Sequence, residues 1–576
     1  MTGFRLHPRS GHRAPLLLSL VFAIGWGLDT GGLLPASVEA WREPVLWAML
    51  ALFAGDALWR ARRDGWRRLW AERRASTALL GLILLGLVAL SVAHLAGASE
   101  GAAPPPAGQH APLLILALWL LSLLELGDLN RGLARRRVPP AVSVLAGFLG
   151  VILVGSLLLL LPAAHAPGRT LGVVDALFTA TSAVCVTGLT VVDTGTAFSR
   201  FGQGSLLALF QIGGLGILTV TSFFALLMFR DLSVREALAV RDNYRTGGLR
   251  GLGGLLGRVV GVTLAVEAAG ALLLWMLAGP RPGAGAGAPF SAVFHSVSAF
   301  CNAGFALSAD SLAAWRGGAV LVVAALIMLG GLGFLVLFEV GTSLRARLTR
   351  RRPRRPSLQA RLVIATSLIL WIGGAVVIHA AERSGTLADV PAPRAWLAAV
   401  FHAVTPRTAG FAMLPAGEMA PATFLVTMLL MFIGGAPGST AGGVKVTTAA
   451  LVLLLLGAYL RGRDRVEMAG RRVGGEVLRL ALAVLGASLV LVAFGTLVLL
   501  LIAPVSLHRA AFEVVSAFGT VGLSTGLSAE LGAGGKLLLA LLMFLGRVGP
   551  LTVVLAVGGA PRERSWRPPA ESVAVG

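Results

Sequence analysis

The stretch AFEVVSAFGTVGLS at residues 511–524 has three close counterparts earlier in the chain. They read LFTATSAVCVTGLT at 177–190, VFHSVSAFCNAGFA at 293–306 and VFHAVTPRTAGFA at 400–412. Each copy has a short apolar segment containing Ser or Thr, then a small or β-branched residue, a glycine, and Leu or Phe. The glycines recur roughly 110 residues apart, which is enough for two membrane spans and a short hairpin per copy. The sequence therefore predicts four repeats, and four copies of one hairpin can surround a single axis.

These hairpins are too short to cross a bilayer on their own. Non-helical backbone at membrane depth occurs only where protein buries it or where it lines a water-filled path. A short re-entrant helix followed by an extended loop can point backbone carbonyls at the axis, and rings of carbonyls replace the hydration shell of a cation. Glycine suits such a loop because it accepts a positive φ and adds no side chain. One such glycine alone would favour simple helix packing, but the aligned set indicates a cation pathway.

With these motifs the chain resembles the Trk/Ktr/HKT superfamily of potassium transporters over about residues 138–560. The resemblance implies an all-α integral membrane protein with four M1–pore-helix–M2 repeats around a pseudo-fourfold pore, and apolar runs before the first repeat predict extra N-terminal transmembrane helices. It implies potassium uptake across the cytoplasmic membrane through this channel-like pore. A glycine cluster in each M2-like helix supports the resemblance: IGGLG from Ile212, LGGLG from Leu329, IGGAPGSTAGG from Ile433 and LGRVG from Leu545.

Carried over residue by residue, the resemblance assigns potassium coordination to the backbone of three residues per repeat, which form a selectivity filter. These are Val186, Thr187 and Gly188; Asn302, Ala303 and Gly304; Thr408, Ala409 and Gly410; and Thr520, Val521 and Gly522. Glycine at all four positions resembles the potassium-selective members, whereas members with Ser in the first repeat lean toward sodium. The third repeat departs by one residue of register and has Pro406 and Arg407 before its glycine. We expect Arg407 to brace this loop from behind, because a cation in the filter would repel the ion.

The third glycine cluster differs from the others, because a helix cannot continue cleanly through GGAPGSTAGG. One interpretation is a kink with small-residue packing. The resemblance instead implies an unwound intramembrane loop that gates the path below the filter. The implied gate residues are Gly434, Gly435, Gly438, Ser439, Thr440, Ala441, Gly442 and Gly443, with Lys445 and Arg547. A charge at the bilayer centre costs roughly 2.5 to 3.5 kcal/mol, so Arg547 should face the bundle interior, as an anchor or as part of the gate.

Composition places the chain in a membrane. With 56% hydrophobic and 13% charged residues and a mean hydropathy of +0.82, it is not an ordinary soluble globule. The net charge of +22 comes from arginines in alternate interhelical loops, which indicates membrane topology and no nucleic-acid partner. The positive-inside rule predicts both termini in the cytoplasm of a bacterium, the chain in the inner membrane and the filters facing outward. The outer loops carry no polar catalytic cluster, so we expect no enzyme activity.

The chain divides into an N-terminal module, four pore units and a tail. We predict a module of about four transmembrane helices at 1–137, pore units at 138–230, 231–344, 345–460 (with the gating loop) and 461–560, and a cytoplasmic tail at 561–576. The predicted M1 and M2 spans are 139–163 and 203–229, 257–279 and 317–343, 362–381 and 421–459, and 477–503 and 535–559.

The resemblance also implies partners. It implies a homodimer with one pore per protomer, seated on a cytoplasmic nucleotide-binding ring of TrkA- or KtrA-like regulatory subunits, so nucleotide is expected only on a separate subunit. We expect K⁺ as substrate, held at the filter residues only, and no covalently bound cofactor. The run RRRPRRP at 350–356 could bind anionic membrane lipid or simply anchor the topology. Cys185 and Cys301 lack the neighbours of a metal site. His295 and His402 are expected at the starts of pore helices, as helix-end polar groups or pH-responsive groups.

Two alternatives remain from the sequence. A sodium-permeable or sodium- or proton-coupled cation transporter of the same family fits the same motifs, because the sequence does not decide between passive and coupled flux or the degree of potassium selectivity. A broken-helix secondary transporter of another solute would usually show two inverted halves, whereas the four copies here run in the same orientation.

Overall fold

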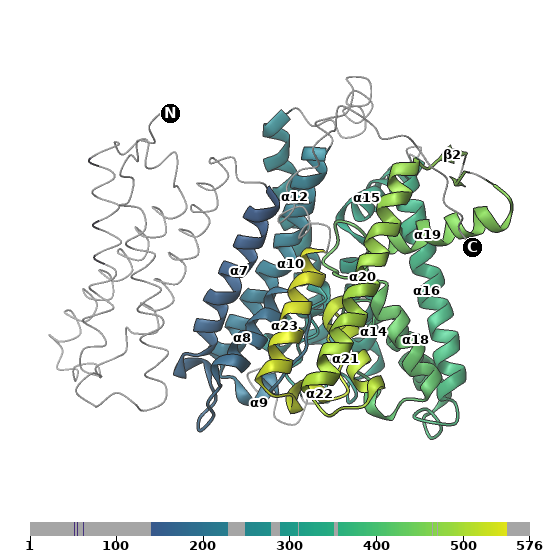
Figure 1. Cartoon of the computed structure of the whole chain (residues 1–576). Coiled ribbons are helices and arrows are strands. Elements are labelled where there is room, and N and C mark those ends of the chain that lie inside the picture. The colour runs from purple at the N-terminus through teal and green to yellow at the C-terminus, as the bar shows by residue number, and fades with distance from the viewer. Residues whose placement is uncertain are drawn as a thin grey trace, which may run out of the picture.

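Helices make up most of the chain that the structure describes (Figure 1). The structure is a computed structural model, and it describes residues 140–228, 248–277 and 288–549, apart from 309, 351–354, 464 and 469, together with the single positions 51, 55 and 62. The predicted N-terminal module, the tail from 561 and the end of the fourth M2 span lie outside the described residues.

The main helices fall into four successive sets, each with a long helix, a short helix and a second long segment. The first set is α7 (Pro140–Leu159), α8 (Val173–Val184) and α10 (Arg200–Met228), and the second is α12 (Gly248–Leu277), α13 (Ala288–Cys301), α14 (Gly317–Leu332) and α15 (Phe334–Leu348). The third is α16 (Leu358–Glu382), α17 (Ala392–Val404), α18 (Pro421–Phe432) and α19 (Val446–Leu460), and the fourth is α20 (Gly475–Ile502), α21 (Leu507–Gly519) and α23 (Ala533–Val548). Short connectors are η3 (Pro162–Ala164), α9 (Thr194–Ala197), η6 (Ala416–Glu418) and α22 (Leu527–Glu530), with the antiparallel pair β1 (Glu467–Met468) and β2 (Arg471–Arg472).

Local sequence explains several helix boundaries. The Ser357 hydroxyl caps α16 by accepting the N–H of Ala360 at 3.1 Å, which satisfies one of the unpaired donors of a helix start. Pro421 begins α18, where its missing N–H costs no helical hydrogen bond. Asp175 lies in the first turn of α8, where the helix dipole favours an acidic side chain.

The long helices carry apolar side chains on their outer faces. On α16 and α20, Ile369 and Leu501 are 70% and 78% exposed. Within the described residues, three helical segments are long and apolar enough to span a membrane, Gly257–Leu277, Leu358–Glu382 and Gly475–Ile502, and the bent pair α14–α15 would make a fourth. Apolar side chains that face outward on helices of this length are suited to a lipid environment.

The four sets pack into a closed ring. The M2 segment of each set contacts the short helix of the next: α10 meets α13, α14 meets α17, α18 meets α21, and α23 returns to α8. Within every set the short helix also contacts both of its longer neighbours, and most of its residues are buried. The short helices α8, α13, α17 and α21 therefore lie on the inside of the ring, where they position the loops that follow them.

The predicted spans agree with the helices except at two M2 segments. Single helices lie over all four predicted M1 spans and over the first M2 span. The predicted span 317–343 is covered by two helices, α14 and α15, which meet at Gly333 with a bend of 109°. The predicted span 421–459 is divided into α18 and α19 by residues 433–445, where the glycine cluster prevents a helix.

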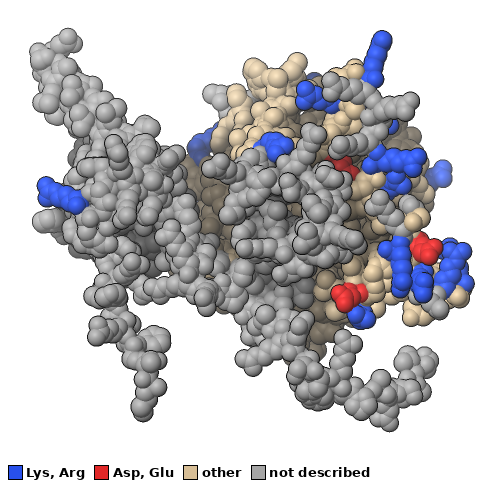
Figure 2. Space-filling view, turned by 90° about the horizontal axis from the view of Figure 1, so that it is seen from above, with Lys and Arg blue, Asp and Glu red and all other residues tan. Residues whose placement is uncertain are grey.

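Basic side chains gather at the end of the molecule where α15, α19 and β2 lie (Figures 1 and 2). The exposed arginines of these elements and the adjoining turns are Arg345, Arg347, Arg350, Arg355, Arg361, Arg461, Arg463, Arg465, Arg472 and Arg479. The connectors α9 and α22 lie at the opposite end (Figure 1). Two of the arginine-rich loops of the sequence, near 350 and 465, are thus at one end of the helical bundle.

Candidate functional site

The loop after each short helix repeats one backbone conformation. The residue two positions before the predicted filter glycine has a positive φ in all four copies: 56° at Val186, 59° at Asn302, 77° at Thr408 and 51° at Thr520. The glycines themselves have φ values of 87°, 72°, 75° and 96° for Gly188, Gly304, Gly410 and Gly522. Positive φ is uncommon outside glycine and costs energy in β-branched residues. The surrounding contacts must therefore hold these loops in place.

One backbone hydrogen bond recurs in all four loops. The N–H of the middle filter residue donates to the carbonyl of a Ser or Thr in the preceding helix. The distances are 2.7 Å for Thr187 to Ser182 and for Ala303 to Ser298, and 2.9 Å for Ala409 to Thr405 and for Val521 to Ser516. The same backbone bond in four copies gives the four loops the same shape.

Side chains tie three of the four loops further. The hydroxyls of Ser298 and Thr405 donate to the carbonyls of Phe305 and Phe411 at 2.9 and 2.7 Å, and Ser516 Oγ accepts the N–H of Gly522 at 3.1 Å. Asn302 Nδ2 donates to Thr408 Oγ1 at 3.2 Å and so joins the second loop to the third. In the first repeat the buried hydroxyl of Ser182 has no hydrogen-bond partner among the described residues.

The four filter glycines contact one another in a ring. A Cβ added to Gly188 would lie 2.5 Å from the carbonyl oxygen of Ala303 and 3.0 Å from the Cα of Gly304. Gly304 has the same relation to the Ala409 carbonyl and Gly410, Gly410 to the Val521 carbonyl and Gly522, and Gly522 to the Thr187 carbonyl and Gly188. Close approach and positive φ both require glycine here. The structure thus brings the middle residue and the glycine of each predicted filter triplet, eight residues from four distant stretches of the chain, into one cluster.

The predicted gate residues form a loop between α18 and α19 whose base is closed. Gly434 N–H donates to the Val444 carbonyl at 2.8 Å, and Val446 N–H donates to the Gly435 carbonyl at 3.0 Å. These bonds and the parallel bridge between Ile433 and Val444 hold the two ends of the loop together. The residues between these two ends belong to neither helix.

The middle of this loop is bonded to helices of the second and fourth sets. Ala436 and Thr440 donate their N–H groups to the carbonyls of Gly331 and Gly330 at 2.9 and 3.3 Å. Phe334, the first residue of α15, donates its N–H to the Gly438 carbonyl at 3.0 Å. In an unbroken helix the Phe334 N–H would bond to a carbonyl of the same helix. Here it bonds to the loop instead, which accounts for the bend at Gly333.

The loop also lies directly beside the fourth filter loop. A Cβ on Gly443 would come 3.2 Å from the Cα of Gly519, and one on Gly442 would overlap the side chain of Thr520. Ser439, Thr440 and Ala441 are 1–2% exposed. The non-helical backbone of this loop is therefore buried in protein, as backbone inside a membrane must be.

Arg547 connects this loop to the first repeat. Its Nη1 donates to the Thr440 carbonyl, and its Nη2 donates to the Gly213 carbonyl on α10 at 2.8 Å. The side chain is 2% exposed. Lys445 Nζ donates to the Ala441 carbonyl within the loop at 2.6 Å. Both cations are thus bonded to backbone carbonyls of the loop.

A second buried arginine holds the base of the loop. Arg407 Nη2 donates to the Gly434 carbonyl at 3.1 Å, and its guanidinium lies 5.2 Å from the ring centre of Trp371, a cation–π contact. The side chain is buried, with 4% exposure. The two arginines therefore contact the same loop at different points, Arg407 at its start and Arg547 at Thr440.

The prediction that His295 and His402 lie at pore-helix starts is wrong. His295 lies in the middle of α13, and His402 lies in the last turn of α17. His295 Nε2 accepts the N–H of Leu307 at 3.3 Å, and His402 Nε2 is 3.3 Å from Thr427 Oγ1. Both imidazoles are buried, so they brace neighbouring segments rather than cap a helix.

Sequence reasoning missed a buried polar cluster beside the second filter loop. Glu267, on α12, is 4% exposed and accepts a hydrogen bond from Gln211 Nε2 of α10 at 3.0 Å. Cys301 Sγ lies 3.3 Å from Gln211 Oε1 and 3.6 Å from Glu267 Oε1. A single acidic residue within the apolar run 257–277 was the signal available in the sequence, since charges inside spans usually face the bundle interior.

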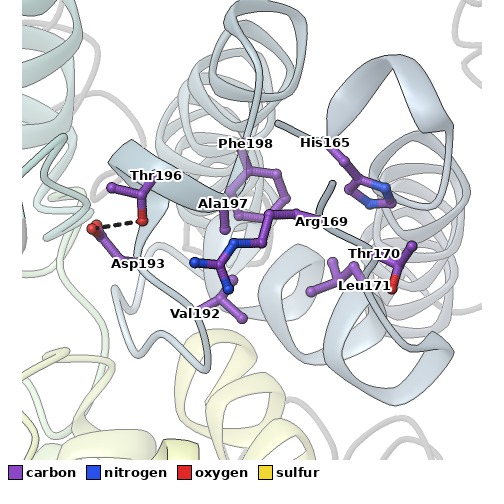
Figure 3. Close-up of a pocket in the computed structure, with 9 residues that line it drawn as sticks. All are labelled: His165, Arg169, Thr170, Leu171, Val192, Asp193, Thr196, Ala197 and Phe198. Carbon is purple, nitrogen blue, oxygen red and sulfur yellow. Dashed lines mark hydrogen bonds between the residues drawn. The ribbon is translucent and has the colours of Figure 1, made fainter. Parts of the chain in front are cut away.

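A pocket of about 290 Å³ lies away from the filter ring, in the first repeat (Figure 3). Its lining includes Arg169, Asp193 and His165, and Figure 3 shows the Asp193 carboxylate turned toward Thr196, whose hydroxyl donates to it at 3.0 Å. Burial lowers the pKa of the His165 imidazole, while its bond to the Leu159 carbonyl opposes that shift. No chemistry predicted from the sequence falls on this pocket, and the filter and gate residues do not line it.

An all-α bundle with apolar helices of membrane length around a ring of buried glycine loops defines a multi-pass membrane transport protein. Comparison with known proteins identifies which kind. A family model described as "TrkH: Cation transport protein" matches residues 145–567. The chain is 38% identical over 425 residues to the Ktr system potassium uptake protein B of Bacillus subtilis, covering 73% of this chain and 93% of that protein. It is 36% identical over 451 residues to the potassium/sodium uptake protein NtpJ of Enterococcus hirae, covering 77% and 98%.

The crystal structure of the potassium transporter TrkH from Vibrio parahaemolyticus matches the fold, with a TM-score of 0.62 at 19% identity over 85% of this chain and 98% of that one. The chain belongs to the TrkH family of cation transport proteins. The resemblance seen in the repeated glycine motifs is thereby confirmed.

Proposed function

We propose that this protein takes up potassium through a pore on the axis of the four glycine loops. The closed ring of Gly188, Gly304, Gly410 and Gly522, with the same positive-φ backbone in every copy, carries the proposal. Such loops direct carbonyl oxygens to a common centre, where they substitute for ion hydration. The names of the relatives, a potassium uptake protein and a potassium/sodium uptake protein, support a monovalent cation as substrate. The proposal requires no catalytic residue and no enzyme activity.

The loop at 434–443 is the proposed gate. It lies against Gly519 and Thr520 at the start of the fourth filter loop and is held by hydrogen bonds to segments of the second and fourth repeats. A segment that crosses between repeats can obstruct their common axis, and it can be moved by displacing the helices that hold it. Lys445 and Arg547 belong to this gate because they bond its carbonyls, and their charge adds a barrier to cations when the loop is in place.

The protein is proposed to lie in the bacterial inner membrane, with the arginine-rich end of Figure 2 in the cytoplasm. Both termini then face the cytoplasm and the filter faces outward. A homodimer and a separate nucleotide-binding ring that pulls on the M2 segments complete the proposal. Any nucleotide acts on that ring, and K⁺ is the only bound ion that this chain needs.

Flux measurements in proteoliposomes containing this chain alone test the proposal. Saturable rubidium or potassium uptake that competing sodium inhibits only weakly is the expected result. Protein-free liposomes and liposomes with a Gly522→Arg variant, which places a cation in the ring, are the controls. Ion-independent exchange of an organic solute, or flux that is unchanged by Gly522→Arg, would overturn it.

A sodium-permeable transporter is the second candidate, because one relative is named for both potassium and sodium. The same liposomes decide it. Equal permeability to both ions supports this second function, and uptake of potassium only in the presence of a sodium or proton gradient supports coupling.

A further inference from the structure

Glu513 lies in the middle of the fourth short helix, α21, and is fully buried, with 0% exposure. Its carboxylate accepts four hydrogen bonds, all from the chain that follows the fourth filter glycine. Oε1 accepts from the Ser524 hydroxyl, from Thr525 N–H at 3.0 Å and from the Thr525 hydroxyl at 3.3 Å, and Oε2 accepts from the Ser528 hydroxyl at 3.0 Å. A buried carboxylate without such donors would be strongly unfavourable. The buried Glu513 carboxylate therefore depends on the donors of Ser524, Thr525 and Ser528, and these donors depend on Glu513 as their acceptor.

The second repeat has the same contact with different chemistry. His295 occupies the equivalent position on α13, and its Nε2 accepts the N–H of Leu307. Leu307 lies three residues after Gly304, just as Thr525 lies three residues after Gly522. Two unrelated side chains thus accept the same backbone N–H, which indicates that the position itself has a role in holding the loop.

The other two repeats use this position differently. In the first repeat Thr179 donates to the Asp175 carbonyl of its own helix at 2.7 Å. In the third repeat His402 contacts Thr427 on α18. The fourth loop is therefore the one that depends on an acidic side chain, and the first repeat supplies a matched position that does not contact its loop in this way.

We infer that Glu513 is a positioning residue for the selectivity filter: it holds the segment Ser524–Ser528 against the pore helix and thereby fixes the carbonyls around Gly522. The inference rests on the proposed potassium function. The segment begins two residues after Gly522, so displacement of its N–H and hydroxyl anchors transmits directly to the filter backbone. Arg509, one turn earlier on α21, bonds Glu530 at 2.9 Å and the Thr525 carbonyl at 3.5 Å, so it also secures this segment.

Relative potassium and sodium permeability, measured per inserted protein in liposomes, tests this role. Glu513→Ala leaves four donors without an acceptor and should lower the potassium-to-sodium ratio by about tenfold, the factor that corresponds to about 1.4 kcal/mol. Glu513→Gln keeps one acceptor oxygen toward Thr525 and should restore part of the ratio. Ser528→Ala removes one donor only and should lower the ratio less, in the same direction. Thr179→Ala, at the matched position of the first repeat, should leave the ratio unchanged.

Each outcome supports or overturns the proposed role of Glu513. If Glu513→Ala does not fold, the ratios of Glu513→Gln and Ser528→Ala decide in its place, and a parental ratio in both overturns the inference. A lowered ratio in Thr179→Ala as large as in Glu513→Ala also overturns it, because the effect would then be general to pore helices. Absence of potassium-selective flux in the parent protein would instead reject the proposed function, so the two failures are distinguishable.

Discussion

The filter loops and the loop at 434–443 are both non-helical backbone inside a membrane protein, but they are held in opposite ways. Each filter loop is fixed mainly by its own repeat, through the bond from its middle residue to the Ser or Thr of its own pore helix. The loop at 434–443 is closed at its base by bonds within its own repeat, but its middle is fixed by bonds to Gly330, Gly331, Phe334 and Arg547 of other repeats.

This difference separates a rigid element from a movable one. Bonds within a repeat survive any motion of one repeat relative to another, so the filter can keep its shape. Bonds between repeats break or shift when the M2 segments move, so the loop at 434–443 changes with them. The variants below test this comparison from its strongest consequence to its weakest.

Gly188→Ser should have the largest effect, because the filter is the part that tolerates least change. The serine Cβ would lie 2.5 Å from the Ala303 carbonyl oxygen at a φ of 87°. We expect the potassium-to-sodium permeability ratio to fall by about tenfold or more with the protein still folded, since a left-handed residue costs roughly 1–2 kcal/mol. Ion competition for flux in liposomes measures it.

The control for this variant is Gly204→Ser, which changes a glycine of the same repeat on α10 with open space around it. It should keep the parental ratio. An unchanged ratio in Gly188→Ser would mean that this glycine serves packing only. The claim that the filter is the rigid element would then be rejected.

Shortening the loop within Pro437–Gly442 should raise basal potassium flux by about tenfold, if the bound loop favours the blocked state by about 1.4 kcal/mol. The dependence on a cytoplasmic regulatory ring should weaken at the same time. The measurement is the maximal uptake rate per inserted protein, with and without the ring. Reduced expression with no gain in unregulated flux would support the simpler kink, and the gate assignment would fall.

Arg547→Gln should produce a smaller increase in flux, of about threefold, because glutamine keeps one donor for the two carbonyls that Arg547 bonds. Arg407→Gln is the matched variant, since it removes another buried arginine bonded to the same loop at its base. We expect Arg407→Gln to lower the melting temperature without raising flux. If Arg547→Gln only reduces the amount of folded protein, by the roughly 3–5 kcal/mol typical of breaking a buried charged contact, its role is anchoring.

The sequence predicts the repeated parts of this molecule well and the unique contacts poorly. The spans on either side of each filter could be placed because apolar length and the spacing of Gly188 to Gly522 are local properties. The break at Gly333 could not, because it arises from the bond between Phe334 and Gly438, two residues far apart in sequence. A pair of glycines does not break a helix by itself: α10 runs continuously through Gly213 and Gly214.

The same distinction applies to the candidate site. Cys301 and Arg407 are recognisable by residue type, but their partners Glu267 and Gly434 lie far away in the sequence and leave no local pattern. Glu513 lies within the repeated motif, but its role depends on its contact with Ser528, which forms only when the chain folds back after the filter. His295 and His402 lie within their helices because α13 begins at Ala288 and α17 at Ala392, well before the two histidines.

The smallest expected effect concerns the outer seam between the fourth and first repeats. Lys536 Nζ on α23 lies 2.6 Å from Asp175 Oδ1 on α8, with side-chain exposures of 14% and 29%. Such a pair joins two repeats, so it belongs with the movable contacts, but partial exposure limits it to about 0.2–1 kcal/mol. Lys536→Met should therefore lower the melting temperature by roughly 1–3 °C at low salt and by less at high salt, where screening already weakens the pair. Asp175→Asn should give the same shift, and the double variant should add little to either one. A shift that is independent of salt, or additive effects of the two changes, would show that the seam is held by packing of α8 against α23 and that the charge pair contributes nothing to closing the ring.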